Sequence, residues 1–370
     1  MRAIQVQDVV ASSRPEGTAK PHPRMTAIHV HDFILDFEAL KDNDGLMSME
    51  FGVPKPILKK GQILIEVKAC SISPGDAMTV HGNMIFMHQP RPFIPGMDVC
   101  GVVVDDNGSH NFKNGDIVVA DNGMSPVGGM AEYMAISEEE AVLKPPQVSV
   151  EEAAASSSAI TARNAVMDHV KKGDRVLILG GSGGVGSAAI QIAKQHAKAS
   201  FVATTSTQDE LCRKLDADVV INYREENWWE RQWDEKFDCI IDCVGGGNFY
   251  KRAHKVLKTG QKGGQFVAVT GDDPKPDCRT VWKGIKFIAA LPWRPLYTRI
   301  KSRSLPKYVL LMPYDSQKGR KEVLHWVDEG TLKIVLDEDS PLPFTAAGVR
   351  TAFAKVAGGH VHGKVVVKIS

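Results

Sequence analysis

Three glycines with a fixed spacing are the residues of this sequence best suited to hold a ligand. Gly181, Gly183 and Gly186 fit the pattern G-x-G-x-x-G. Its glycines allow a sharp turn, a close approach of backbone to a pyrophosphate, and tight packing of a helix on a strand. Free N–H groups and the dipole at the start of the following helix favour negative charge. The spacing predicts a phosphate-binding turn, although the pattern alone also occurs in plain loops.

The segments around these glycines have the patterns of a strand and a helix. An apolar run, Val176 to Leu179 closed by Gly180, predicts a buried parallel strand, and an amphipathic helical stretch follows the turn. Four more strands, with helical patterns between them, are predicted at Ser200 to Thr204, Val219 to Tyr223, Phe237 to Val244 and Gln265 to Thr270. This alternation predicts a doubly wound parallel α/β sheet that binds a dinucleotide at its first strand.

Length and composition restrict the classes of protein. A chain of 370 residues exceeds one ordinary core, so two domains are expected. A net charge of +1 without a dense basic run argues against a nucleic-acid partner. No apolar run reaches the roughly 18 to 20 residues that cross a bilayer. The six cysteines form no C-x-x-C pair, which favours buried free thiols over disulfides or a zinc lobe.

The chain outside the predicted sheet divides into an extension and a second module. Residues 1–24 predict a loosely ordered N-terminal extension of a cytoplasmic protein, with a mitochondrial presequence as the alternative. Short strands separated by Gly, Pro, Asn and Asp predict a β-rich domain over residues 25–150. The closing segment 316–370, with a strand near Leu332 to Leu336 and a terminal strand at Lys364 to Ile369, is expected to complete that domain. Residues 151–315 are then the nucleotide-binding domain.

Several ordered motifs carry a resemblance to a known family. They are ACSISPGD from Ala69, FIPGMDVCGVV from Phe93, NGDIVVA from Asn114, GGMAEYMAI from Gly128, the glycine turn, INYREE from Ile221, FDCIIDCVGG from Phe237 and HGKVVV from His362. The chain resembles the medium-chain dehydrogenase/reductases, and most closely their zinc-free quinone oxidoreductase branch. The resemblance implies a GroES-like catalytic domain, a Rossmann domain, a cleft between them and a homodimer. Ile285 to Leu291 resembles the edge strand through which such relatives pair.

The residue types at two positions bear on whether a metal takes part. In zinc-dependent relatives a Cys and a His ligate the catalytic ion, and the matching positions here are Ser73 and Met97. Neither side chain supplies a thiolate or an imidazole. We therefore expect no metal site, and the scattered histidines are assigned to the surface.

Without a Lewis acid an alcohol sheds its proton poorly, whereas an electron-poor acceptor takes hydride at a carbon that is already electrophilic. The resemblance thus implies hydride transfer from a nicotinamide cofactor to a quinone or an α,β-unsaturated carbonyl. Two alternatives stay open. One is an enoyl-thioester reductase, and the other is a catalytically weak member that binds nucleotide or a protein partner.

The cofactor is expected to be NADPH rather than NADH. The end of the second predicted strand reads Ala203, Thr204, Thr205, Ser206, without the carboxylate that usually holds the adenosine ribose of NAD. Ser206 is expected to donate to a 2′-phosphate, beside Tyr223 of the INYREE motif. The full set of expected cofactor-binding residues is Gly181, Ser182, Gly183, Gly184, Val185, Gly186, Thr205, Ser206, Tyr223, Val244, Thr270 and Gly271.

Three polar residues are the expected catalytic set. Ser73 stands where the family has an asparagine near the nicotinamide, and Asp76 in the same motif is expected to order the loop rather than to transfer protons. Thr161 matches a threonine that faces the nicotinamide ribose in relatives. It is expected to relay a proton or to fix the ring, with water as the alternative proton source. Trp229 and Trp233, at helical spacing, are expected to pack a helix against the sheet.

Overall fold

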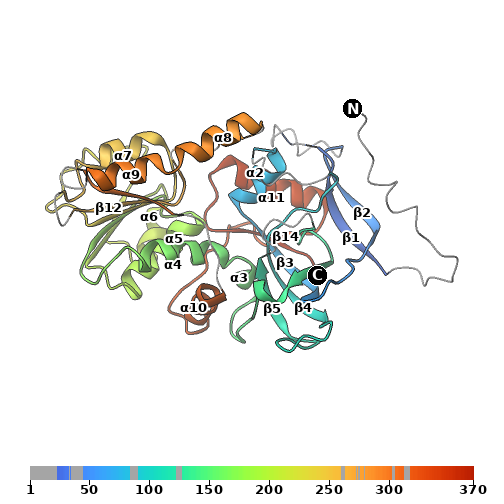
Figure 1. Ribbon diagram of the computed structural model, residues 1–370. Coiled ribbons are helices and arrows are strands. Elements are labelled where there is room, and N and C mark those ends of the chain that lie inside the picture. The colour runs from blue at the N-terminus through green and yellow to red at the C-terminus, as the bar shows by residue number, and fades with distance from the viewer. Residues whose placement is uncertain are drawn as a thin grey trace, which may run out of the picture.

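The computed structural model describes most of the chain in segments separated by gaps. These segments are residues 23–32, 34, 45–83, 91–121, 127–259, 263–271, 273, 276–278, 280–301, 305–311 and 317–370. Of the expected extension 1–24, only the last two residues lie within them. Two large sheets, with helices around them, organise the described chain (Figure 1).

The first large sheet has six strands in the order β10-β9-β8-β11-β12-β13. Every neighbouring pair is parallel. The strands are β8 (Arg175–Leu179), β9 (Phe201–Thr205), β10 (Val219–Ile221), β11 (Cys239–Asp242), β12 (Gln265–Ala268) and β13 (Lys307–Leu310). The prediction of a doubly wound parallel sheet is confirmed, and the five predicted strands are β8 to β12. The chain order reverses beside β8, which is where open α/β sheets bind ligands.

Burial explains why these segments form strands and helices. Val176 to Leu179 in β8 are at most 1% exposed, as expected for a strand covered on both faces. Helices lie on both sides of the sheet in Figure 1, with α4 and α5 below it and α7 and α9 above it. The helices of this part are α3 (Val150–Ala154), α4 (Ser157–Met167), α5 (Gly184–Gln195), α6 (Asp209–Lys214), α7 (Gly247–Ala253), α8 (Val281–Ala290), α9 (Trp293–Ile300) and α10 (Gln317–Asp328).

The second large sheet belongs to the β-rich part of the protein. It contains strands from both the N-terminal and the C-terminal parts of the described chain. Its strands follow the order β14-β15-β3-β4-β5-β7, with β6 paired to β3, and β1 pairs β2 separately. The strands are β1 (Arg24–Val30), β2 (Met47–Pro54), β3 (Gln62–Ile72), β4 (Asp98–Asp105), β5 (Ile117–Asp121), β6 (Tyr133–Ser137), β7 (Ala141–Leu143), β14 (Leu342–Pro343) and β15 (Val365–Lys368). Helices α2 (Pro74–His81) and α11 (Ala346–Gly358) and the 3-10 turn η3 (Glu138–Glu140) accompany them.

The pairing of β15 with β3 brings the end of the chain back to the N-terminal sheet. The two strands are antiparallel, and Val365 lies opposite Ile72. The domain limits 25–150 with 316–370, and 151–315, remain our proposal.

Three local predictions were wrong. Ile285 to Leu291 is not an edge strand, because Thr280 caps a helix there: its Oγ1 accepts from the N–H of Lys283 at 3.3 Å. The edge strand is β13 instead. Leu332 to Leu336 forms no strand but one bridge, Leu336 to Lys364.

The predicted helix at the tryptophan cluster is the third error, since residues 227–233 contain no helix and 228–230 form a turn. Asn227 accepts from the N–H of Glu230 at 2.9 Å, which closes a turn in place of a helix. Trp228 is 3% exposed and belongs to a core cluster with Phe237. The tryptophans therefore pack against the sheet as expected, but from a loop.

Two predictions on composition can be compared with the structure. All six cysteines are free thiols. In the part of the chain that the structure describes, no helix is long and apolar enough to cross a membrane.

Candidate functional site

The glycine turn follows β8 and leads directly into α5. Gly180 has a φ of +85°, a left-handed conformation that favours glycine. A Cβ atom on Gly181 would lie 2.1 Å from Oγ1 of Thr204, and one on Gly186 would lie 2.1 Å from the carbonyl oxygen of Gly180. Packing within the protein therefore requires glycine at 181 and at 186.

Gly183 has a different environment. A Cβ there would meet only the carbonyl oxygen of Gly180, at 3.6 Å, which is an ordinary contact. Gly183 is the N-cap of α5, and no side chain caps this helix. The first N–H groups of a helix have no intrahelical acceptor. The space at Gly183 and these donors fit a pyrophosphate, so the residues present suit a dinucleotide.

The predicted residues at the end of β9 lie beside this turn. Oγ1 of Thr205 accepts from the N–H of Gly180 at 3.0 Å, and its carbonyl oxygen accepts from the N–H of Gly181 at 3.0 Å. Ser206 is 2% exposed, and its Oγ accepts from the N–H of Gln208 at 2.9 Å. Thr205 therefore holds the turn, while the hydroxyl of Ser206 lies inside the loop that leads to α6.

Val244 lies close to the turn at the carboxyl end of β11. A Cβ on Gly180 would lie 2.8 Å from its Cγ2. Asp242, which the sequence reasoning missed, holds this loop: Oδ1 accepts from the N–H groups of Val244 at 3.0 Å and Gly245 at 2.9 Å. Asp242 is 2% exposed. A buried carboxylate thus fixes the shape of the loop beside the predicted nucleotide site.

Thr270 and Gly271 reach the same loop from the end of β12. A Cβ on Gly245 would lie 2.9 Å from Cγ2 of Thr270 and 3.0 Å from the carbonyl oxygen of Gly271. Tyr223 lies just beyond β10 and is 49% exposed. The predicted cofactor residues therefore gather at the carboxyl ends of neighbouring strands, with Tyr223 the outermost of them.

Ser73 and Asp76 form a reciprocal capping pair at the start of α2. The Ser73 Oγ donates to Oδ2 of Asp76 at 2.7 Å, and the N–H of Ser73 donates to the same oxygen at 2.8 Å. The other oxygen, Oδ1, accepts from the N–H of Met97 at 3.0 Å. Asp76 is 2% exposed. It therefore ties α2 to the loop before β4.

The electrostatic environment of Asp76 favours its neutral form. Burial raises the pKa of this carboxyl to about 6, and the nearby negative charge of Asp98 acts in the same direction. Hydrogen bonds from Ser73 and the charge of Lys364 oppose the rise. The pair Ser73 and Asp76 thus contains a group that changes charge near neutral pH.

Asp98 and Lys364 form a buried ion pair that the sequence reasoning missed. The Lys364 Nζ lies 3.6 Å from Oδ2 of Asp98, and Ser157 at the start of α4 donates to that oxygen at 2.5 Å. The two charged residues are 7% and 4% exposed, respectively. Residues from β4, from α4 and from the position just before β15 therefore meet at one polar cluster.

The C-terminal segment connects this polar cluster to the glycine turn. The N–H of Gly363 donates to the carbonyl oxygen of Ser182 at 2.8 Å. A Cβ on Gly184 would lie 3.1 Å from Cγ and Cδ of Lys364. The stem of Lys364 thus runs past the first turn of α5, within which Val185 is partly buried.

Thr161 lies one turn into α4 from Ser157. Its Oγ1 donates to the Ser157 carbonyl oxygen at 3.3 Å, and its side chain is partly exposed. The structure therefore places Thr161 on the helix that contacts both the ion pair and α5. Among the described residues, the Thr161 hydroxyl makes no hydrogen bond to Ser73 or Asp76.

Comparison with known proteins identifies the family. The alcohol dehydrogenase GroES-like domain matches residues 59–147, and a domain described as zinc-binding dehydrogenase matches residues 215–367. The NADPH-dependent alkenal/one oxidoreductase of Arabidopsis thaliana is 32% identical over 333 residues, covering 87% of this chain and 76% of the relative. A chloroplast envelope quinone oxidoreductase homologue of the same plant is 31% identical, covering 85% of this chain and 92% of its own.

The chain belongs to the medium-chain dehydrogenase/reductase superfamily, in its quinone oxidoreductase-like branch. The resemblance predicted from the motifs is confirmed. Solved structures agree: the quinone oxidoreductase of Coxiella burnetii has a TM-score of 0.73 at 26% identity, covering 94% of this chain and 100% of that one. A thermostable alcohol dehydrogenase of Pyrobaculum aerophilum, at 20% identity and a TM-score of 0.68 over 94% of this chain and 100% of its own, shares the fold.

The description of one matching domain includes zinc binding. In this dehydrogenase/reductase, Ser73 and Met97 stand at the two positions that match zinc ligands in zinc-dependent relatives. The hydroxyl of Ser73 donates its hydrogen bond to Asp76. The methyl carbon of Met97 lies against the start of α2, 3.1 Å from where a Cβ on Gly75 would be. Within the described residues, no group of three His, Cys, Asp or Glu side chains is placed to hold a metal ion.

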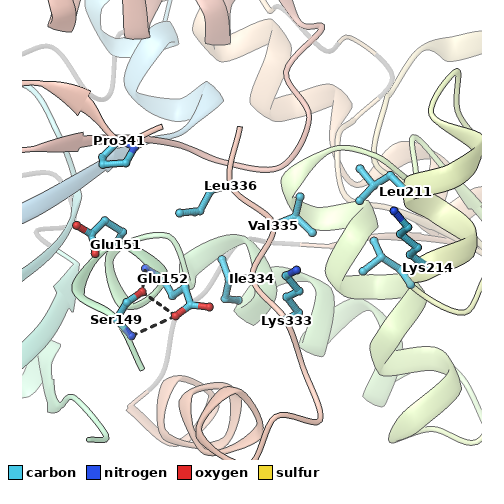
Figure 2. Close-up of a pocket in the computed structure, with 11 residues that line it drawn as sticks. Ser149, Glu151, Glu152, Leu211, Lys214, Lys333, Ile334, Val335, Leu336 and Pro341 are labelled. Atoms are coloured by element: carbon cyan, nitrogen blue, oxygen red, sulfur yellow. Dashed lines mark hydrogen bonds between the residues drawn. The ribbon is translucent and has the colours of Figure 1, made fainter. Parts of the chain in front are cut away.

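A cavity of about 560 Å³ lies elsewhere in this dehydrogenase/reductase (Figure 2). Glu151, Glu152, Lys214 and Lys333 line it together with apolar residues, and it contains none of the predicted site residues. Val335 also lines it, and its carbonyl oxygen accepts from the N–H of Lys364 at 2.9 Å. The segment at 363–364 therefore contacts both the glycine turn, through Gly363, and a wall of this cavity, through Lys364.

The missed residues do carry a signal in the sequence. Asp98 and Lys364 are single charges directly beside apolar strand residues, at VCGVVV and VVV. Charged residues are almost never fully buried without a partner. Two such charges of opposite sign therefore point to a buried pair, although their sequence positions do not say that the partners meet.

Proposed function

We propose that this protein reduces a quinone or an α,β-unsaturated carbonyl compound with hydride from NADPH, without a catalytic zinc ion. The names of the relatives support the choice of acceptor: one is an NADPH-dependent alkenal/one oxidoreductase, and another is a quinone oxidoreductase homologue. A 2-methylene-furan-3-one reductase of Solanum lycopersicum, 32% identical over 87% of this chain and 75% of its own, is also named for a conjugated ketone.

The observation that carries the proposal is the partly buried hydrogen bond between Ser73 and Asp76. It occupies the hydroxyl at a position where zinc-dependent relatives have a ligand thiolate. With Met97 at the second position, the site offers hydrogen bonds in place of two strong zinc ligands. Such a site suits an acceptor whose oxygen gains negative charge that donors and a proton can stabilise.

Residues of this chain would bind and orient the cofactor and the acceptor. NADPH, when bound, supplies the hydride. The first N–H groups of α5 would bind its pyrophosphate, and Val244, Thr270 and Gly271 would border the dinucleotide at the strand ends. Asp76 would hold Ser73 in place, so that the Ser73 oxygen borders the nicotinamide as a hydrogen-bond acceptor. Thr161 would orient the nicotinamide or the acceptor by exchanging its bond to the Ser157 carbonyl oxygen for one to the ligand.

The preference for NADPH rests on the end of β9. Neither Thr205 nor Ser206 is a carboxylate that could hold a ribose diol, and Tyr223 is exposed nearby. Apparent KM values for NADPH and NADH, measured with one acceptor, test this choice. A clear preference for NADH would contradict it.

The reaction is tested by NADPH consumption against quinones, small enones and crotonyl thioester, each with and without a chelator. We expect turnover of a quinone or an enone at a rate that the chelator leaves unchanged. Loss of activity with chelator, restored by zinc, would contradict the metal-free site. Turnover of the thioester alone would favour an enoyl-thioester reductase, and nucleotide binding without any turnover would favour a binding role. A homodimer and a cytoplasmic location remain part of the proposal.

A further inference from the structure

Large apolar side chains are concentrated on the surface of one short segment. Of the fifteen large hydrophobic residues that are exposed in the described chain, eight lie between Val281 and Ile300. They belong to α8 and α9, two orange helices in Figure 1: α9 lies above the parallel sheet, and α8 extends beyond the edge of that sheet toward α2. Soluble monomers rarely expose a contiguous apolar surface of this kind, and such a surface marks an interaction site.

The exposed stripe on α9 is an inverted amphipathic pattern. Trp293, Leu296, Tyr297 and Ile300 have the i, i+3, i+4, i+7 spacing of one helix face, and they are 70%, 56%, 45% and 73% exposed. The buried residue of this helix is polar: Thr298 is 0% exposed, and its Oγ1 accepts from the N–H of Tyr308 in β13 at 3.1 Å. The polar side of α9 is thus attached to the sheet, and the apolar side faces outward.

Helix α8 presents a similar face. Val281, Trp282, Ile285 and Ile288 are 61%, 75%, 48% and 47% exposed, and Gly284 is its one buried residue. Leu291 and Pro292, between the helices, keep right-handed helical dihedral angles. The two exposed apolar stripes therefore follow one another directly along the chain.

The side-chain charges of α8 and α9 favour a partner with negative charge. Residues 281–301 contain five basic residues, Lys283, Lys286, Arg294, Arg299 and Lys301, and no acidic residue. Lys283 pairs with Asp277 at 2.6 Å, and Arg294 lies over the rings of Tyr250 and Tyr308. Positive charge still exceeds negative charge along the stripe.

We propose that the α8–α9 face, defined as the exposed apolar residues of these two helices, docks onto an anionic lipid surface. Tryptophan and aliphatic side chains on one face with Lys and Arg beside them are the pattern of helices that lie in the membrane interface. Basic residues at that depth are attracted to acidic headgroups. A second copy of the chain on the same face would instead bring two sets of basic residues together across a twofold axis. The proposal concerns binding and does not depend on the proposed reaction.

Flotation of the full-length protein with phospholipid vesicles tests the proposal. We expect binding to vesicles of phosphatidylcholine with 30% phosphatidylglycerol, and little binding to phosphatidylcholine alone. The variants Trp282→Ser/Ile285→Ser and Leu296→Ser/Ile300→Ser should each weaken binding by about tenfold or more. Lys286→Glu/Arg299→Glu should do so only at low salt. Circular dichroism and NADPH consumption with a soluble acceptor should stay as in the wild type.

A matched control uses apolar residues exposed elsewhere. Phe51 and Ile57 are each 78% exposed, outside α8 and α9, so Phe51→Ser/Ile57→Ser should bind vesicles like the wild type. Failure of the wild-type protein to float with anionic vesicles would overturn the proposal, as would equal loss in the control. A third overturning result is a dimer, seen by light scattering, that the α8 and α9 variants convert to monomers without any vesicle binding. That result would assign the face to a second copy.

Discussion

Lys364 and Asp98 meet in an ion pair of 3.6 Å that joins the segment just before the last strand, β15, to β4. Both side chains are almost completely buried there. Asp98 is 7% exposed and Lys364 is 4% exposed. The stem of Lys364 passes the first turn of α5, so the pair lies between the β-rich sheet and the glycine turn. Removal of one partner would leave the other charge buried without compensation.

The first prediction follows from that burial. Lys364→Met should lower the free energy of unfolding by about 3–5 kcal/mol, because breaking a buried pair leaves an unpaired carboxylate. Asp98→Asn should be similarly harmful, since Lys364 then loses its counter-charge. Urea denaturation monitored by fluorescence measures both.

The double variant Lys364→Met/Asp98→Asn provides the control. It carries no uncompensated charge and should recover a substantial part of the lost stability, giving a coupling free energy between the two sites. If the double variant is no more stable than predicted from the sum of the single changes, the ion pair does not hold this part of the fold.

The second prediction concerns Asp76 and pH. Its folded pKa of about 6 lies above the ordinary value of 3.8, so the folded state binds the proton more tightly than the unfolded state. The stabilising contribution is complete below about pH 4 and is lost as the pH rises to 6. At 1.36 kcal/mol per unit, the loss is about 3 kcal/mol. Urea denaturation between pH 4 and pH 7.5 measures it.

Asp76→Asn removes this titration and keeps a similar shape. The difference in unfolding free energy between wild type and variant should therefore change in favour of the variant as the pH rises from 4 to 6. Parallel curves for the two proteins over that interval would show that Asp76 titrates at its ordinary pKa.

The third prediction distinguishes the roles of two glycines of the turn, Gly183 in nucleotide binding and Gly181 in packing. Gly183→Ala should fold normally, with a cost within about 1 kcal/mol, because the new Cβ meets only the Gly180 carbonyl oxygen at 3.6 Å. It should nevertheless weaken NADPH binding at least about tenfold, since it fills the space expected for the pyrophosphate. Fluorescence titration with NADPH and urea denaturation measure the two effects.

Gly181→Ala is the matched comparison. Its Cβ would lie 2.1 Å from Oγ1 of Thr204, so overpacking should cost about 1–3 kcal/mol of stability. If Gly183→Ala binds NADPH as well as the wild type does, the turn does not hold the nucleotide at that position.

The parts of the fold that could be predicted are those determined by local patterns. Val176 to Leu179 are a continuous apolar run before the glycines, and such a run has few alternatives to a buried parallel strand. The motif around Ser73 and Asp76 could be located by its resemblance to the family, and the structure shows that its serine and acidic residue, three positions apart, form a capping box.

Features that depend on distant contacts could not be predicted. Nothing local in the sequence reveals that Lys364 meets Asp98, and the role of Asp242 depends on a loop that exists only in the folded chain. The segment Ile285 to Leu291 was misread because its apolar residues resemble the edge strand of relatives, and that resemblance does not include the residue that starts a helix before them. Ile285 and Ile288 are exposed on the surface of α8, and the N-cap at Thr280 starts a helix there.

The last prediction tests the hydroxyl of Thr161. Within the described chain its hydroxyl hydrogen-bonds only to the Ser157 carbonyl oxygen of the same helix, at 3.3 Å, so Thr161→Val should fold with little loss of stability. If the hydroxyl orients the nicotinamide or passes a proton, kcat should fall by about tenfold or more. Thr161→Ser, which keeps the hydroxyl, should recover most of the rate. Steady-state kinetics with NADPH and an enone measure kcat and KM separately. Unchanged values in Thr161→Val would remove this residue from the mechanism, and equal losses in both variants would assign the effect to the methyl group and its packing.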